Sequence, residues 1–131
     1  MVDVKKTNSK TLLIVEDDDV LLRTLYLVFH KSGFTIATAV DGDTALKMAQ
    51  RLKPDMVLLD LLLPKMNGFD FLKNLKANPE LKKIPVVVLS NLGEENIQKA
   101  KELGAIDYFI KSDTSLNNLK EMVLKILSRN I

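Results

Sequence analysis

Hydrophobic and polar positions follow two patterns along the chain. Four short runs are continuously apolar, which is typical of strands buried on both faces of a parallel sheet. They span residues 12–15, 56–59, 86–89 and 108–110. A further segment, residues 34–38, alternates apolar and polar positions, which indicates a half-exposed strand at a sheet edge. The pattern therefore predicts five strands.

Segments with helical spacing separate these runs. Their apolar residues recur at intervals of three and four, so each segment presents one apolar stripe that packs on a core. Asn67 is a plausible N-cap for the third helix, and Asp18 and Asp19 stand where the first helix begins. The stripes comprise Leu21, Leu25, Val28 and Phe29; Ala45, Met48, Ala49 and Leu52; Leu72 and Leu75; Ile97, Ala100 and Leu103; and Leu116, Leu119, Met122, Val123, Ile126 and Leu127.

Strands and helices thus alternate as five β/α units, (βα)5. This order predicts an α/β fold with a doubly wound parallel sheet and right-handed crossovers. We expect one domain over residues 11–129, preceded by a basic, flexible tail over residues 1–10 and followed by no output domain. Ligands of such sheets bind beyond the carboxyl ends of the strands.

The composition of the chain limits the kinds of functional site that it can form. The chain has 131 residues and a net charge of +2, with no cysteine and one histidine. The tail carries this surplus, so the body is neutral, which disfavours a nucleic-acid surface. Thiolate and multi-histidine metal sites are excluded, and His30 is expected at the surface. Neither a membrane span nor a signal peptide is apparent, so we expect a cytoplasmic protein.

Polar side chains follow the apolar runs. Glu16 and Asp17 follow the first run, Asp60 the second, Ser90 the third and Lys111 the fourth. Clustered carboxylates repel one another unless a cation lies among them, and an all-oxygen site suits Mg²⁺. The hydroxyl and the ammonium are donors suited to a phosphoryl group. A strand-end carboxylate could attack phosphorus and become an acyl phosphate.

Five motifs in order resemble the receiver domain of bacterial two-component response regulators. They are LIVEDD at residues 13–18, PDMVLLD at 54–60, PKMNG at 64–68, VLS at 88–90 and GAIDYFIK at 104–111. Each motif is weak alone, but their order and spacing together are specific, and they cover nearly the whole chain. The resemblance implies a flavodoxin/CheY-like fold with strand order 2-1-3-4-5.

The resemblance also implies roles for the strand-end acids. Asp60 would be the phosphoacceptor. Mg²⁺ would be held by Asp17 directly, by Glu16 through water, by Asp60 and by the backbone carbonyl of Leu62. Asp18 occupies the place of a third acid in the family motif but need not touch the metal, and its alternative role is a helix N-cap.

Three further residues receive roles by resemblance. Ser90 would be the switch hydroxyl that turns toward the phosphoryl group. Lys111 would pair with a phosphoryl oxygen. Tyr108 would be the aromatic switch whose ring moves inward with Ser90.

The implied function is that of a stand-alone response regulator in a phosphorelay. A histidine kinase or a histidine phosphotransfer protein would donate the phosphoryl group, and the switch would signal to a downstream protein. A homodimer could form through the fourth helix, fifth strand and fifth helix. The domain would assist its own phosphorylation without being a turnover enzyme.

Four residues near the site bear on this expectation. Ser112 follows Lys111 where the family usually has proline, often after a cis bond, and Asn91 follows Ser90 where the family usually has alanine. Leu62 and Leu92 stand at variable positions flanking the pocket. Leucines there cannot orient an attacking water, so we expect slow self-dephosphorylation.

Two other functions compete. A phosphatase with an aspartate nucleophile also forms an acyl phosphate, but it needs a second aspartate two residues after the first, where this chain has Leu62. A receiver fold kept only for binding would have lost the acceptor or the acids, which are present here. Ser112 and Asn91 are the residues that keep this second alternative open.

Overall fold

The computed structural model describes residues 10–128 and has five strands alternating with five helices. The predicted tail lies outside the described residues except for Lys10, and so does residue 129. In chain order the elements are β1 (Thr11–Val15), α2 (Asp19–Lys31), β2 (Thr35–Ala39), α3 (Gly42–Leu52), β3 (Met56–Leu59), α4 (Gly68–Ala77), β4 (Val86–Ser90), α5 (Glu94–Glu102), β5 (Asp107–Ile110) and α6 (Leu116–Ser128).

The five strands form one parallel sheet in the order β2-β1-β3-β4-β5. β2 pairs on one side of β1, and the chain then crosses back to add β3, β4 and β5 on the other side. The predicted doubly wound fold and strand order are confirmed. Because all strands run the same way, their carboxyl ends meet at one edge of the sheet.

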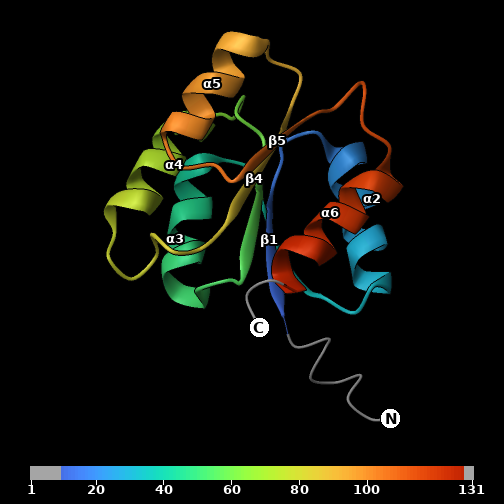
Figure 1. Ribbon diagram of the computed structural model, residues 1–131. Helices are drawn as coiled ribbons and strands as arrows, with labels where there is room; N and C mark the ends of the chain where they lie inside the picture. Colours follow the sequence, from blue (N-terminus) through green and yellow to red (C-terminus); the bar gives the residue numbers. More distant parts are fainter. Residues whose placement is uncertain (1–9, 129–131) are drawn as a thin grey trace.

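Helices cover both faces of the sheet, as Figure 1 shows: α3, α4 and α5 lie on one side, α2 and α6 on the other. Successive side chains of a strand point to opposite faces. In β1, Leu13 and Val15 accordingly enter the core under α3, α4 and α5, whereas Leu12 and Ile14 enter the core under α2 and α6. The continuous apolar runs of the inner strands supply both cores.

The two edge strands are less buried than the inner three. β2 is half-exposed, as its alternating pattern predicts. β5 is half-buried along its whole length, so the prediction that residues 108–110 are buried on both faces is wrong. Its apolar run is short and it has one neighbouring strand, β4, which leaves its other side open. Leu52, placed in an apolar stripe, is 43% exposed at the last position of α3.

Two of the helices that start at the carboxyl edge, α2 and α4, begin at a side-chain cap. Asp18 accepts hydrogen bonds from the backbone N–H groups of Val20 and Leu21, which confirms its N-cap role. Asn67 accepts from the N–H of Asp70 at 3.0 Å, as predicted. His30 is exposed, as expected. Within the described part of the chain, every helix is too short or too polar to cross a bilayer.

Candidate functional site

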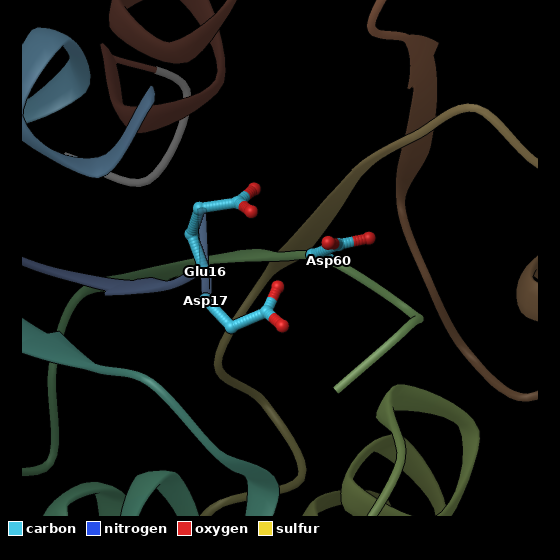
Figure 2. Close-up of side chains that lie close together, drawn as sticks. All are labelled: Glu16, Asp17 and Asp60. Carbon is cyan, nitrogen blue, oxygen red and sulfur yellow. The ribbon is translucent and has the colours of Figure 1, made fainter. Parts of the chain in front are cut away.

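Three carboxylates converge at the carboxyl edge of the sheet. Glu16 and Asp17 follow β1, Asp60 follows the neighbouring strand β3, and one oxygen of each lies within 4.8 Å of the others. Figure 2 shows the side chains of Glu16 and Asp17 close to that of Asp60. Glu16 and Asp60 are only 2% and 5% exposed, whereas Asp17 is exposed to solvent. The strand-end acids predicted to meet therefore do so.

Lys111 joins two of these acids. Its Nζ lies 2.9 Å from Oε1 of Glu16 and 3.0 Å from Oδ2 of Asp60. It leaves the sheet directly after β5, two strands away from β3. The expected approach of the ammonium to Asp60 is present, and the contact with Glu16 is an addition that the sequence did not indicate.

Burial and charge shift the ionisation of this group. Burial raises the pKa of Glu16, and the carboxylate of Asp60 adds to the rise, although hydrogen bonds from Lys111 and Asp18 oppose it. Burial lowers the pKa of Lys111, but the hydrogen bonds to Glu16 and Asp60 outweigh it, so that pKa is raised overall. The site thus holds its acids close together by means of one internal cation.

A buried hydroxyl stands beside this cluster. Ser90 is the last residue of β4, is 1% exposed, and its Oγ has no hydrogen-bond partner within the described residues. A buried polar atom without a partner is costly, and such an atom calls for an explanation such as a functional role. The Oγ of Ser90 is therefore available to a further hydrogen-bond acceptor.

The hydroxyl of Tyr108, on the edge strand β5, is bonded to a backbone carbonyl. It donates to the carbonyl oxygen of Leu92 at 3.2 Å. Burial raises the pKa of Tyr108, with a further contribution from the carboxylate of Asp60. The phenol thus ties β5 to the loop between β4 and α5.

The loop after Asp60 doubles back onto that residue. The N–H of Leu62 donates to Oδ1 of Asp60 at 3.3 Å, and the side chain of Leu62 is 60% exposed. A Cβ on Gly68 would lie 2.5 Å from Cα of Leu61 and 2.6 Å from the carbonyl oxygen of Asp60, so only glycine fits at this position. Close backbone packing therefore holds the loop next to Asp60.

The start of α3 contacts the same loop, and no sequence pattern indicates this contact. Asp41 caps α3 through Thr44, which lowers the pKa of the Asp41 carboxyl. A Cβ on Gly42 would lie 1.9 Å from the backbone oxygen of Met66. The aspartate before a helical stripe is a capping signal that marks the helix start. No local signal announces that Gly42 touches a loop 24 residues further along the chain.

The last loop keeps Lys111 in place without the usual proline. No peptide bond between described residues is cis, so the bond from Lys111 to Ser112 is trans, and the ammonium still reaches Asp60. The N–H of Ser112 donates to Oδ1 of Asn91 at 2.9 Å. The two residues that depart from the family pattern therefore contact each other.

The donor set of the cluster fits a hard divalent cation. It offers carboxylate oxygens without nitrogen or sulfur ligands, and Asp17 is open to solvent on one side. Mg²⁺ prefers a few carboxylates and retains several waters. The cluster of Glu16, Asp17 and Asp60 could therefore hold a metal ion.

The sequence matches the family model of the response regulator receiver domain over residues 12–124. The chain belongs to this family and is a receiver domain of two-component signalling. It is 35% identical over 120 residues to sporulation initiation phosphotransferase F of Bacillus subtilis, a match that covers 91% of this chain and 94% of that protein. Among solved structures it is similar to the Mn(2+)-bound form of response regulator Rcp1, with a TM-score of 0.77, 35% identity, and coverage of 92% of this chain and 93% of that one.

Other relatives are longer than the present chain. The alkaline phosphatase synthesis transcriptional regulatory protein PhoP of Bacillus subtilis is 36% identical over 104 residues, which are 79% of this chain but 42% of PhoP. The match to the response regulator PleD of Caulobacter vibrioides covers 23% of that protein. The chain thus spans less than half the length of these two relatives.

Proposed function

We propose that this receiver domain is a signalling switch that accepts a phosphoryl group on Asp60. The observation that carries the proposal is the setting of the Asp60 carboxylate. It is buried beside two further acids and a lysine ammonium, and the neighbouring strand ends in the buried, unpartnered hydroxyl of Ser90. Acids for a metal and donors for phosphoryl oxygens thus surround one nucleophile.

The covalent step is a displacement at phosphorus. A carboxylate oxygen of Asp60 attacks phosphorus, and the bond from phosphorus to its former carrier breaks. The leaving electron pair goes to acetate when acetyl phosphate is the donor, or to a histidine imidazole that then takes up a proton. Asp60 is left as an acyl phosphate. One domain accepts one group, so the protein is a phosphoacceptor and not a turnover enzyme.

Two donors would hold the new phosphoryl group. Lys111 already lies at hydrogen-bond distance from Asp60, so its ammonium can move to a phosphoryl oxygen. Ser90 would satisfy its free Oγ by turning to a second oxygen. Tyr108 would then leave the carbonyl of Leu92 and follow Ser90 inward. A few charge-assisted bonds would in this way repack the edge of the sheet.

The metal in this proposal is Mg²⁺. Glu16, Asp17, Asp60 and the backbone carbonyl of Leu62 would hold it, and when bound it offsets charge on the phosphoryl oxygens. The all-oxygen donor set supports this assignment. A Mn(2+)-bound form of the similar regulator Rcp1 supports the binding of a divalent cation by this receiver domain.

The partners follow from the same switch. A histidine kinase or a histidine phosphotransfer protein in the cytoplasm would be the donor, and a protein would receive the output. The surface of α5, β5 and α6 is the proposed contact face, for that target or for a second copy. A groove there is lined in part by Phe109, Met122 and Leu124.

Incubation with acetyl phosphate and Mg²⁺, followed by intact-protein mass measurement, tests the proposal. We expect a single phosphoryl adduct on the wild-type protein and none on Asp60→Asn. Asp70→Asn, an exposed aspartate on α4, is the matched control and should keep the adduct. EDTA should abolish the adduct in both active proteins. A wild type without an adduct would favour a fold kept for binding alone.

A further inference from the structure

One hydrogen bond joins the two loops that carry the proposed phosphoryl donors. The backbone N–H of Ser112 donates to the side-chain Oδ1 of Asn91 at 2.9 Å, across 21 residues of sequence. Asn91 directly follows Ser90, and Ser112 directly follows Lys111. The bond therefore lies one residue beyond each of the two side chains that would contact the phosphoryl group.

The bond continues the pairing of two strands past their ends. β4 and β5 run parallel up to the pair Ser90 and Ile110, and the N–H of Lys111 still donates to the carbonyl of Ser90 at 3.1 Å. At the next residue the side-chain oxygen of Asn91 takes the place of a backbone acceptor. The two loops thus stay in register for one step beyond the sheet.

Both residue types are needed for this contact. A residue at position 91 must carry an acceptor of the right length, and a residue at position 112 must have a backbone N–H. Alanine lacks the acceptor, and proline lacks the N–H. The alanine and proline usual at these positions in the family could not form the bond, so the two departures of this chain act as a pair.

The rest of the last loop is held by local bonds. The N–H groups of Asp113 and Thr114 both donate to the carbonyl of Ile110 at 3.0 Å, which closes a turn within the loop. Those bonds shape the loop but do not tie it to β4. The direction in which Lys111 leaves the sheet therefore depends on its own N–H and on that of Ser112.

We propose that Asn91 is a positioning residue that holds Ser112 and thereby aims the ammonium of Lys111 at Asp60. This inference rests on the proposed phosphorylation of Asp60. Asn91 and Ser112 are both exposed, so their bond competes with water and adds little to stability. Its effect is on geometry, where a displacement of about 1 Å can slow a reaction by about a hundredfold.

Four variants test this assignment. Asn91→Ala removes the acceptor, Ser112→Pro removes the donor, and the double variant removes both. Ser112→Ala is the matched control, because it changes the side chain and keeps the N–H. The rate of phosphorylation by acetyl phosphate at saturating Mg²⁺ reports the position of Lys111. Amide proton exchange at Ser112, followed by NMR in wild type, Asn91→Ala and Ser112→Ala, reports the bond itself.

We expect Asn91→Ala to slow phosphorylation by about tenfold, to speed exchange at Ser112, and to leave the thermal unfolding midpoint unchanged. Ser112→Ala should match the wild type in all three measurements. The double variant should be no slower than the slower single variant, because one bond cannot be lost twice.

Several results would overturn the inference. Unchanged exchange in Asn91→Ala would show that the bond is not formed in solution. Faster exchange with an unchanged rate would show that the bond does not position Lys111. Additive losses in the double variant would show two separate effects. A wild type that takes up no phosphoryl group would instead contradict the proposed function, and this inference with it.

Discussion

Lys111 and Asp60 form a partly buried ion pair, with Nζ 3.0 Å from Oδ2, although 51 residues separate them in sequence. The same ammonium lies 2.9 Å from Oε1 of Glu16. One cation thus compensates two buried carboxylates at the end of the sheet. A divalent cation arriving among the acids would take over part of this task and free the lysine for a phosphoryl oxygen.

Lys111→Met should leave Glu16 and Asp60 buried without a counter-charge. Breaking a buried ion pair from one side typically costs about 3 kcal/mol of unfolding free energy. We expect a loss of about 2–3 kcal/mol in urea denaturation without metal. Mg²⁺ should restore more stability to this variant than it adds to the wild type, because it supplies the missing positive charge.

Lys73→Met is the control for that experiment. Lys73 is exposed on α4, so its replacement should change the unfolding free energy by less than about 0.5 kcal/mol. If Lys111→Met were as stable as this control, the ion pair would contribute nothing to the fold. A Mg²⁺ effect no larger than in wild type would show that metal and ammonium do not share the site.

Asp17→Asn should stabilise the metal-free protein and remove its response to Mg²⁺. The neutral amide relieves repulsion from Glu16 and Asp60, which we put at about 0.5–1 kcal/mol for a partly solvated pair. The variant also loses a proposed metal ligand, so Mg²⁺ should no longer raise its unfolding midpoint. Circular dichroism melts in EDTA and in Mg²⁺ measure both effects.

Asp19→Asn is the control that distinguishes loss of a metal ligand from a general change in surface charge. Asp19 is exposed and pairs with Arg23 on α2, outside the acid cluster. Its replacement should leave the Mg²⁺ response intact. Equal responses in the two aspartate variants would mean that Asp17 does not bind the metal.

Stability should fall as the pH rises past 10. The pKa of Tyr108 is raised from 10.0 and that of Lys111 from 10.5, so the folded protein keeps protons there that the unfolded chain loses. Burial lowers the pKa of Lys76 from 10.5. Below pH 10.5 this residue therefore makes stability rise with pH, opposite to the effect of Tyr108 and Lys111. The difference between wild type and Tyr108→Phe isolates the phenol.

In urea denaturation, Tyr108→Phe should cost about 0.5–1.5 kcal/mol near pH 8, because the hydrogen bond to Leu92 is lost. Above pH 10 the wild type should approach the variant, since ionisation of the phenol removes the same donor. Parallel pH profiles for the two proteins would show that the Tyr108 hydroxyl ionises with its ordinary pKa.

The acyl phosphate should hydrolyse slowly in the wild type. Leu62 is 60% exposed beside Asp60, and Leu92 is half-buried on the other flank, so neither offers a polar group to an attacking water. Leu62→Asn should release phosphate about tenfold faster, which is less than the roughly hundredfold or more that a fully positioned acid–base group contributes. Leu62→Met preserves the apolar character and should behave like the wild type. Equal rates in wild type and Leu62→Asn would contradict the screening role.

Replacement by serine should have opposite effects on stability at Gly42 and at Gly93. Gly42→Ser forces a Cβ against the backbone oxygen of Met66, so we expect a loss of about 1–3 kcal/mol in unfolding free energy. Gly93→Ser meets nothing within 4 Å and adds a capping hydroxyl to α5, for a gain of about 0.3 kcal/mol. Equal stability of the two variants would show that the loop at Met66 adjusts to a side chain at position 42 without a loss of unfolding free energy.

The main outline of the fold could be read from local patterns. Buried parallel strands need continuous apolar runs, and helices against a sheet need stripes, so the number and order of elements follow from the sequence. The convergence of Asp60, Ser90 and Lys111 follows as well, because the carboxyl ends of parallel strands share one edge. Even the cap at Asn67 is a local signal, since its side chain bonds three residues away.

The tertiary structure alone decided which of these groups are buried and what they touch. Periodicity does not show that Glu16 is enclosed while Asp17 is open, or that Lys111 bridges two acids. It missed the exposed side of β5, because position in the sheet sets burial there. The contact of Asn91 with Ser112 depends on how two loops leave adjacent strands. Such contacts are set by angles and distances between distant segments, which one-dimensional spacing does not encode.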